Sequence, residues 1–340
     1  MSRTMLLARR PGLLCMLCQS RGFSTSYRLL AEQGPTTAKA AKPATDNQPT
    51  KPGAPASPAS DPAPPKVIPP SPLADAPRSY GKRTEKFTPK PLSRPIGMPN
   101  PPRPGENTGI DSRTLRQRRD DFVNYDKHLK RREELVSKVS RPYFRDWSNL
   151  RFHNGKTFFP PPRPFKGDVS LFFPNLYGRT LSKRDPKPRD TTPALRGRVS
   201  VVSVFSSVWA ENQISSFVAR DANPELDDLL AKNSDLAQRV WLNVEENALK
   251  AWLIRLFMGG IRRRVGEPNW DRYFIVRKGL NDDIRENTGL LNSSVGYVYL
   301  LDGNCRIRWA GSGPSEDHER EGLVKAVQRL LEEARSPKKS

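Results

Sequence analysis

A pair of cysteines near the N-terminus is the first group of residues with a spacing suited to chemistry. Cys15 and Cys18 form a C-x-x-C, which supports thiol–disulfide exchange or one half of a zinc site. They lie, however, in a stretch of 31 residues that has five arginines and no acidic residue, a composition typical of a mitochondrial transit peptide. We expect cleavage after Phe23, so that residues 1–23 are a presequence and both cysteines are lost on import.

The remaining candidates for chemistry are isolated from one another in the sequence. Cys305 would be the sole thiol of the mature chain, and beside a turn we expect it to be a packed side chain rather than a nucleophile. His128, His153 and His318 share no metal-ligand spacing with cysteine or aspartate. The "GSG" at 311–313 precedes a helix but lacks the Gly-Lys-Ser/Thr ending of a phosphate loop. We predict no catalytic residue, no metal and no cofactor.

The elements that would position reactive groups begin with a buried strand. Val199 to Phe205 is almost continuously apolar, as expected for a central parallel strand covered on both faces. A short loop with Ser206 and Ser207 leads into a helix over 211–231, interrupted near Pro224. The other elements expected before the C-terminal part are strands at 171–173, 239–244 and 272–276 and helices at 246–258 and 281–288.

The C-terminal part has the clearest pattern. "GYVYLLDGNCRIRWAG" contains two strands joined at Asp302-Gly303-Asn304, which is a strong hairpin motif. Ser315 is the expected cap of a final helix whose apolar stripe ends at Leu331. A β-α-β-α half followed by a β-β-α half is the order of the thioredoxin-like fold. We therefore predict an α/β, thioredoxin-like domain.

Thioredoxin-like enzymes carry two reactive cysteines in the loop after this strand, and this chain has none there. The proline that normally precedes the C-terminal hairpin is also missing, since Ser294 and Val295 occupy that place. Both departures argue against an oxidoreductase. A redox enzyme could still act through Cys305, and the phenotype of the variant Cys305→Ser would test that possibility. Three residues lie where a thioredoxin engages an extended polypeptide: Trp209, Asn212 and Gln213. Either they bind polypeptide or they only cap the helix and pack.

The helix expected at 246–258 is the second candidate surface. Its apolar face, which begins at Leu249, is wider than one contact with a sheet requires, and a basic cluster follows the break at Gly259-Gly260. In the simplest interpretation this face packs on the sheet. We hypothesise instead that it binds a client protein or a membrane, because Lys and Arg near a membrane are attracted to lipid phosphates. The residues concerned are Trp252, Leu253, Leu256, Phe257, Arg262, Arg263 and Arg264.

The N-terminal half differs in composition from the rest. Residues 34–104 hold 20 of the 34 prolines, so we predict a disordered Pro-rich linker over 24–110. Residues 1–165 have a net charge of +17 (30 Lys+Arg, 13 Asp+Glu), against +5 for residues 166–340 (28 and 23). Such a basic segment suits targeting, an anionic membrane surface or nucleic acid. No stretch reaches the roughly 18 consecutive apolar residues of a membrane-spanning helix.

A basic helix is expected at 111–139, and with an ordered collar it makes up the segment 111–164. Its apolar stripe recurs every seven residues, at Leu115, Phe122, Leu129 and Val136. Either this stripe docks on the domain, or the helix lies on anionic lipid or on a partner. The thioredoxin-like domain is predicted at 165–335, and residues 336–340 form a basic tail.

Four segments together resemble one protein family: "LFFPNLYGRTL", "VVSVFSSVWAENQISSF", "ENALKAWLIRLF" and "NSSVGYVYLLDGNCRIRWAGSG". They are similar to the mitochondrial assembly-factor family that helps build the F0 sector of ATP synthase, over roughly residues 120–335. The resemblance implies a chaperone, peripheral to the matrix side of the inner membrane. It would bind newly made subunit a (subunit 6) and promote its association with the subunit c ring. It implies no catalytic residues.

The alternative function is that of a mitochondrial RNA-binding or mitoribosome-associated protein, because basic mitochondrial proteins often bind RNA. No RNP-like motif interleaves basic residues with aromatics on a strand, and the six tryptophans have the pattern of core or edge positions. We therefore expect no nucleic-acid partner. Salt-dependent retention of RNA by the mature protein would favour the alternative.

Overall fold

The computed structural model describes residues 71–79, 83–111, 113–139 and 144–336. The presequence expected at 1–23, the first part of the expected linker and residues 337–340 of the basic tail lie outside these ranges. The described residues belong to one compact unit, Val67–Ser340. None of the helices in the described ranges combines the length and the apolar content needed to span a bilayer.

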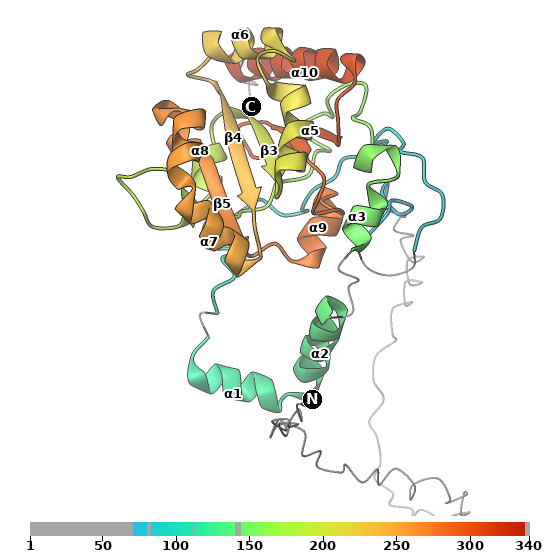
Figure 1. Ribbon diagram of the computed structural model, residues 1–340, viewed down its shortest axis with the longest axis vertical. Helices are drawn as coiled ribbons and strands as arrows, with labels where there is room; N and C mark the ends of the chain where they lie inside the picture. The colour runs from blue at the N-terminus through green and yellow to red at the C-terminus, as the bar shows by residue number, and fades with distance from the viewer. Residues whose placement is uncertain (1–70, 80–82, 112, 140–143, 337–340) are drawn as a thin grey trace, which may run out of the picture. The chain divides into compact units, whose positions relative to one another are not determined.

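A seven-stranded mixed sheet lies at the centre of the domain (Figure 1). In space the strands follow the order β2-β1-β5-β4-β3-β6-β7. Strands β3, β4 and β5 are parallel, whereas β6 pairs antiparallel with β3, β7 with β6, and β1 with β5 and β2. Their bounds are Tyr177–Thr180 (β1), Arg189–Asp190 (β2), Val199–Phe205 (β3), Ala237–Val244 (β4), Tyr273–Lys278 (β5), Tyr297–Leu301 (β6) and Ile307–Ser312 (β7).

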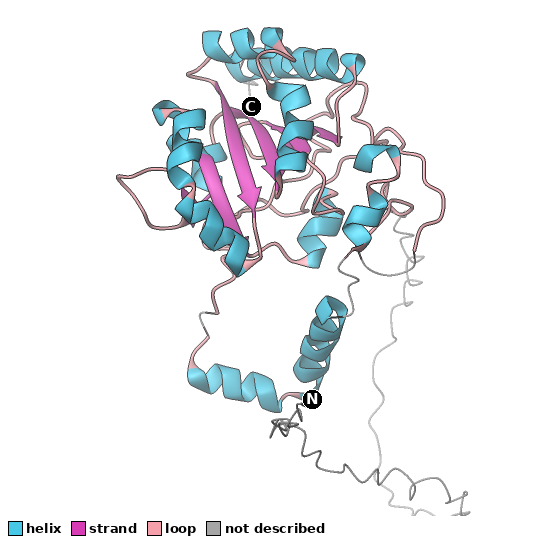
Figure 2. Cartoon of the chain, in the orientation of Figure 1, coloured by secondary structure: helices cyan, strands magenta, loops and turns pink. Residues whose placement is uncertain are grey.

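Helices cover one face of this sheet (Figure 2). There α5, α6, α8 and α10 bury their apolar side chains together with Val199 and Val201 of β3. The opposite face is covered by α9 and by irregular segments from the N-terminal part of the domain. The helix bounds are Leu115–Val123 (α1), Tyr125–Val139 (α2), Arg145–Asn149 (α3), Thr192–Leu195 (α4), Val208–Val218 (α5), Pro224–Lys232 (α6), Ala248–Leu256 (α7), Met258–Val265 (α8), Asp282–Thr288 (α9) and Asp317–Arg335 (α10), with short 3-10 helices at His153–Gly155 and Glu267–Arg272.

The strand order is that of the thioredoxin-like fold predicted from the sequence. The unit β3-α5-β4 forms a parallel pair, in which Val202 is opposite Val240, and the unit β6-β7-α10 adds an antiparallel hairpin on the other side of β3. The strands expected at 239–244 and 272–276 are present with small shifts of their ends. The short helix expected at 281–288 is also present, and Gly289, with φ +78°, ends it in the left-handed conformation.

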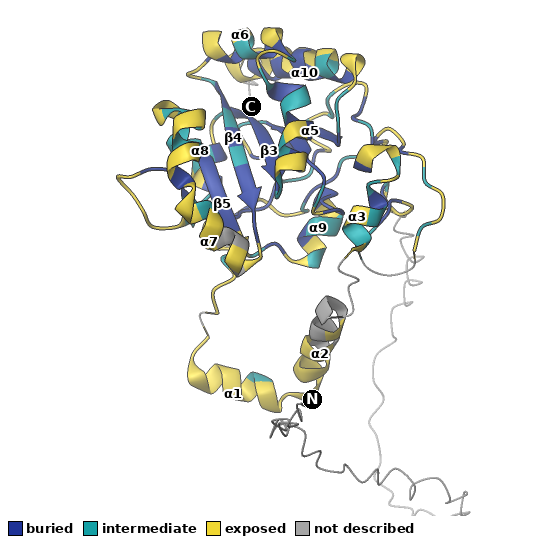
Figure 3. Ribbon diagram, in the orientation of Figure 1, coloured by how far each residue is buried: buried dark blue, intermediate teal, exposed yellow. Residues whose placement is uncertain are grey.

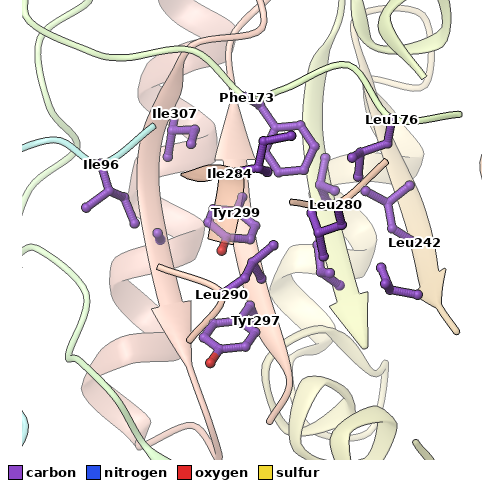
Figure 4. Packing of buried hydrophobic residues seen from close by; sticks show 14 of the residues in the cluster. Ile96, Phe173, Leu176, Leu242, Leu280, Ile284, Leu290, Tyr297, Tyr299 and Ile307 are labelled. Atoms are coloured by element: carbon purple, nitrogen blue, oxygen red, sulfur yellow. The ribbon is translucent and has the colours of Figure 1, made fainter. Parts of the chain in front are cut away.

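The core on the face opposite α5 joins side chains that are distant in sequence (Figure 4). Tyr299 of β6 packs edge-to-face on Phe173, with 5.4 Å between the ring centroids. Its hydroxyl donates a 2.8 Å hydrogen bond to the carbonyl oxygen of Thr288. The aliphatic side chains of Ile96 and Ile284 belong to the same cluster. The N-terminal segment, α9 and β6 therefore form one packed unit.

The ordered domain begins earlier than predicted. We call residues 71–79 and 83–111 the N-terminal strap. Four of its apolar side chains are buried in the core: Leu73, Ala76, Leu92 and Ile96. Arg78 also forms two hydrogen bonds, of 2.8 and 3.0 Å, with the carboxylate of Glu286 on α9. The prediction of a disordered linker up to residue 110 is wrong for these residues, because a few anchors bury enough surface against the sheet to order a proline-rich chain.

The basic helix expected at 111–139 is two helices. Asn124, with φ −71° and ψ 112°, has an extended backbone and separates α1 from α2. Across this break, the rings of Phe122 and His128 lie 5.8 Å apart in an edge-to-face contact. The apolar stripe does not dock on the domain, since Leu115 is 83% and Val136 58% exposed (Figure 3).

Two local predictions are also corrected. Residues 171–173 are not a strand, because Phe172 forms isolated bridges to other segments instead. Ser315 does not cap the last helix, since its backbone N–H and its hydroxyl both bind Ser216. Glu316 is the N-cap of α10 and forms a capping box with the first turn.

The connection between α7 and α8 also differs from the prediction. The helix expected at 246–258 ends at Leu256, and Phe257, with φ −89° and ψ 8°, is the N-cap of the next helix. Gly259 and Gly260 lie inside α8, after the break, and beyond the backbone of its own helix a Cβ added at either would meet no atom within 4 Å. The glycines therefore do not make the break.

Candidate functional site

The loop between β3 and α5 uses both of its serines for internal hydrogen bonds. Ser207 is the N-cap of α5, and its Oγ accepts a 3.1 Å bond from the backbone N–H of Ala210. Ser206 donates its hydroxyl to the carbonyl oxygen of Ser293, in the loop before β6. At the position of the thioredoxin-like reactive loop, these serines hold the fold together.

A cavity of about 350 Å³ lies at this end of the sheet. Its lining includes Asp146 and Trp147 of α3, together with Ser206 and Ser293. One carboxylate oxygen of Asp146 accepts a 3.2 Å bond from the backbone N–H of Ser293, and its other oxygen is buried without a hydrogen-bond partner. Neither a thiol nor a histidine lines the cavity. It can accept hydrogen bonds from a ligand but cannot support thiol–disulfide exchange.

Of the three residues proposed to bind polypeptide at this loop, Gln213 is buried. Its side-chain amide donates a 2.7 Å bond to the carbonyl oxygen of Asn154, and its amide oxygen accepts a 2.9 Å bond from the N–H of Gly296. Gln213 therefore joins α5 to two other segments and does not face solvent. Trp209, 49% exposed, and Asn212, also exposed, remain accessible to a partner.

Cys305 is buried in the hairpin between β6 and β7, as predicted for a packed residue. Burial raises the pKa of its thiol to about 11, so the thiol is protonated at neutral pH and is a poor nucleophile. Among the described residues, no group of three or more His, Cys, Asp or Glu side chains could hold a metal ion.

The apolar face of α7 is exposed to solvent. One side of the helix packs on the domain through Ile254, which contacts the core cluster of α5, α8 and α10. The other side carries Trp252 and Leu256, which are 57% and 64% exposed, and Leu249 and Leu253 beside them are also exposed. Phe257, the residue after the helix, is 65% exposed. Figure 3 shows most of α7 in the colour of exposed residues. The simplest interpretation, in which this face packs on the sheet, is not what the structure shows.

The three arginines predicted to follow this face have different environments. Arg262 is half-buried and donates a 2.7 Å bond from Nε to the carbonyl oxygen of Leu181. Arg264 forms a 2.9 Å ion pair with Glu211 of α5. Arg263 is exposed and has no ion pair within the described part of the chain. Of the cluster, Arg263 is thus the one with a guanidinium free for a partner.

Three basic residues near α7 were missed by the sequence analysis. Arg255 in the last turn of α7 and Arg277 and Lys278 at the end of β5 line one further cavity, of about 250 Å³. They come from two elements, α7 and β5, and no local motif links Arg255 to the other two. The only signal that the sequence offers for them is that Arg277 and Lys278 are adjacent and directly follow the strand expected at 272–276.

Comparison with known proteins decides the family. The profile of the family described as "ATP10 protein" matches residues 78–330 of this chain. The chain belongs to the ATP10 protein family. This confirms the family resemblance carried by the four sequence segments, and the match extends into the N-terminal strap.

Two curated relatives of this ATP10-family chain share the name "Mitochondrial ATPase complex subunit ATP10". The protein of Eremothecium gossypii is 33% identical over 245 residues, which cover 71% of this chain and 85% of the relative. The protein of Saccharomyces cerevisiae is 30% identical over 252 residues, which cover 71% of this chain and 87% of the relative.

Solved structures with some similarity to this ATP10-family chain are thiol–disulfide proteins. A DsbF homologue from Corynebacterium diphtheriae has 11% identity and a TM-score of 0.33, covering 49% of this chain and 90% of its own. A secreted thiol-disulfide isomerase from Corynebacterium glutamicum has 9% identity and a TM-score of 0.34, covering 50% and 90%. The thioredoxin-like fold of this chain is shown by its strand order β4-β3-β6-β7.

Proposed function

We propose that this ATP10-family protein is an assembly factor of the mitochondrial ATP synthase. It binds the newly synthesised membrane subunit a and promotes its association with the subunit c ring in the F0 sector. It acts as a peripheral protein on the matrix side of the inner membrane. The names of its relatives connect the family with the mitochondrial ATPase complex, and the exposed face of α7 is the observation that supports client binding.

The face of α7 has the physical properties that such a client requires. A membrane subunit outside its complex exposes apolar surface, and covering apolar surface is favourable by about 25 cal/mol per Å². Trp252, Leu256 and Phe257 lie within six residues of the chain and are all more than half exposed. Contiguous exposed apolar residues mark interaction sites on proteins. The exposed Arg263 on the adjoining helix adds a charge that can meet lipid phosphates at the membrane surface.

The proposed role involves no catalysis. The hydroxyls of Ser206 and Ser207 are engaged inside the fold, and Cys305 is buried. We assign to the exposed Trp209 and Asn212 a second contact with the client polypeptide, in which the protein holds its client without turnover.

The test is a pulse-label of organelle translation products in isolated mitochondria that contain the protein with a C-terminal tag. New subunit a is expected in the tag pull-down, and its amount is expected to fall during the chase as the enzyme assembles. The decisive variant is Leu256→Ser, and its matched control is Val169→Ser, because the two side chains are 64% and 59% exposed. Both changes remove an exposed aliphatic group, so neither should disturb the fold.

Recovery of subunit a is expected to fall several-fold with Leu256→Ser and further with Trp252→Ser added, while the Val169→Ser control behaves like the unchanged protein. Equal recovery from all variants would contradict the role of α7. Recovery of ribosomal RNA or ribosomal proteins without subunit a would overturn the proposed function and support the RNA-binding alternative.

A further inference from the structure

The cavity beside α7 is lined by positive charge without a compensating carboxylate. It has a volume of about 250 Å³ and lies between β1, β5, α7 and the end of the N-terminal strap. Its cationic lining residues are Arg179, Arg255, Arg277 and Lys278, and no acidic residue lines it. The remaining lining is apolar or neutral and includes Ile110, Tyr177 and Ile275.

The four cations are placed at the cavity by three elements, β1, β5 and α7. Arg277 and Lys278 are exposed at the end of β5, where the burial of the strand stops. Arg255 lies in the last turn of α7. Arg179 of β1 donates a 2.7 Å bond from Nε to the carbonyl oxygen of Pro186, which orients its guanidinium. Within the described ranges none of these four residues forms an ion pair, so a bound anion would relieve their mutual repulsion.

Apolar surface borders the cavity on two sides. On α7, Trp252 precedes Arg255 by three residues, so the two side chains are neighbours on the helix surface. On the other side Ile110, itself a lining residue of the cavity, is 62% exposed. An occupant that joins an anionic group to an apolar body matches both parts of this surface. A soluble phosphate ester would use the charges but leave the apolar border in water.

We propose that this cavity binds the phosphate headgroup of an anionic glycerophospholipid, with the acyl region of the bilayer against the exposed side chains of α7. The inference rests on the proposed function, in which the protein works at a membrane surface, and it names the lipid chemistry that holds it there. The volume of about 250 Å³ accommodates a headgroup rather than a whole lipid, so the acyl chains remain in the membrane.

The test is flotation of the purified full chain with lipid vesicles. One set contains phosphatidylcholine with about one quarter phosphatidylglycerol, and the other contains phosphatidylcholine alone. The cavity variant combines Arg255→Gln, Arg277→Gln and Lys278→Gln. The control variant removes three exposed cations elsewhere, through Arg220→Gln, Lys232→Gln and Lys325→Gln. Both variants lower the net charge by the same amount, so attraction by overall charge is matched.

The cavity variant is expected to bind the anionic vesicles about tenfold to a hundredfold more weakly than the unchanged chain, since each basic residue near the surface contributes about a fivefold factor. The control variant is expected to lose far less. Equal losses in the two variants would overturn the proposal, because general charge would then explain the binding. Calorimetric binding of soluble glycerol 3-phosphate without vesicle binding would also overturn it, since the ligand would then be a soluble ester.

The two proposals can fail separately. Absence of subunit a from the pull-down of the unchanged protein would contradict the proposed function. If the cavity variant nevertheless bound anionic vesicles more weakly than the control variant, the lipid site would be supported. Normal recovery of subunit a, with flotation that is insensitive to the cavity variant, would contradict the lipid site alone.

Discussion

Lys156 and Glu319 form a buried ion pair that joins the segment before β1 to the last helix. The Nζ atom lies 2.8 Å from both carboxylate oxygens, and the two side chains are 3% and 0% exposed. Nζ also donates a 2.8 Å bond to the carbonyl oxygen of Pro314. Such a pair contributes little net stability compared with apolar residues, but breaking it leaves a charge buried without its partner.

Replacing Lys156 by Met is therefore expected to lower the free energy of unfolding by about 3–5 kcal/mol, as measured by urea denaturation. The matched control is Lys325→Met, which removes a lysine from an exposed 3.4 Å pair with Glu321 and should cost less than about 1 kcal/mol. Adding Glu319→Met to the first variant should restore only part of the loss, because it removes the unpaired buried carboxylate but also the acceptor of the Glu316 N–H in the capping box of α10. A Lys156→Met protein as stable as the control would contradict the assignment of Lys156 and Glu319 as a buried ion pair.

Gln213 is expected to act on stability rather than on client binding. The variant Gln213→Ala leaves the buried N–H of Gly296 and the carbonyl of Asn154 without their partner, at a cost of about 1–3 kcal/mol. Asn212→Ala, at the exposed neighbouring position, should leave thermal unfolding unchanged. If Gln213→Ala instead reduced recovery of subunit a at unchanged stability, Gln213 would contact the client after all.

Cys305 is expected to resist alkylation in the native protein. At about pH 8 iodoacetamide should modify it much more slowly in the folded chain than in urea, because burial raises the pKa of this thiol to about 11, against about 8.5 for an exposed thiol. Rapid modification of the native chain would show that the hairpin opens or that the thiol is accessible.

The same shift gives the sign of a pH effect on stability. Between about pH 8.5 and the folded pKa of about 11, the folded thiol of Cys305 keeps a proton that the unfolded thiol has lost. The contribution of the Cys305 thiol to the free energy of unfolding is therefore complete below about pH 8.5 and falls as the pH rises towards 11. The variant Cys305→Ser should show a smaller decline in this range, when unfolding by urea is measured at each pH. An identical decline in both proteins would contradict the assigned pKa.

The central sheet could be predicted from the sequence because its signals are local. A continuous apolar run marks β3, and Asp302-Gly303-Asn304 marks the hairpin between β6 and β7. The N-terminal strap has no such pattern. Leu73 and Ile96 are isolated among prolines, and their burial depends on a surface made by α9 and β6, far away in the sequence. For this reason the composition of the N-terminal strap predicted a disordered linker rather than an ordered part of the domain.

The candidate site was predictable only in part, for the same reason. The amphipathic pattern of α7 identified its apolar face, but the pattern is the same whether that face meets the sheet or solvent. The packing of Ile254 decides the orientation of the helix. Arg262, Arg263 and Arg264 have separate environments, and the cavity beside α7 gathers charges from three elements. Both features depend on tertiary contacts that a single sequence does not display.

Replacing glycine by alanine is expected to have opposite effects on stability at Gly279 and at Gly260. Gly279, with φ +93°, follows β5, and a Cβ there would lie 1.6 Å from the carbonyl oxygen of Asn107 in the N-terminal strap. Gly279→Ala must displace the strap and adopt an unfavourable backbone conformation, so it should cost about 2–4 kcal/mol of stability in urea unfolding.

Gly260→Ala is the contrasting change, because a Cβ at this position in α8 would meet no atom within 4 Å. Alanine loses less backbone entropy than glycine in a helix, so this variant should be more stable by up to about 1 kcal/mol. Because the break between the helices is at Phe257 and not at the glycines, stiffening α8 should leave recovery of subunit a unchanged. If Gly260→Ala raised stability but abolished that recovery, Gly260 would instead be a hinge that client binding requires.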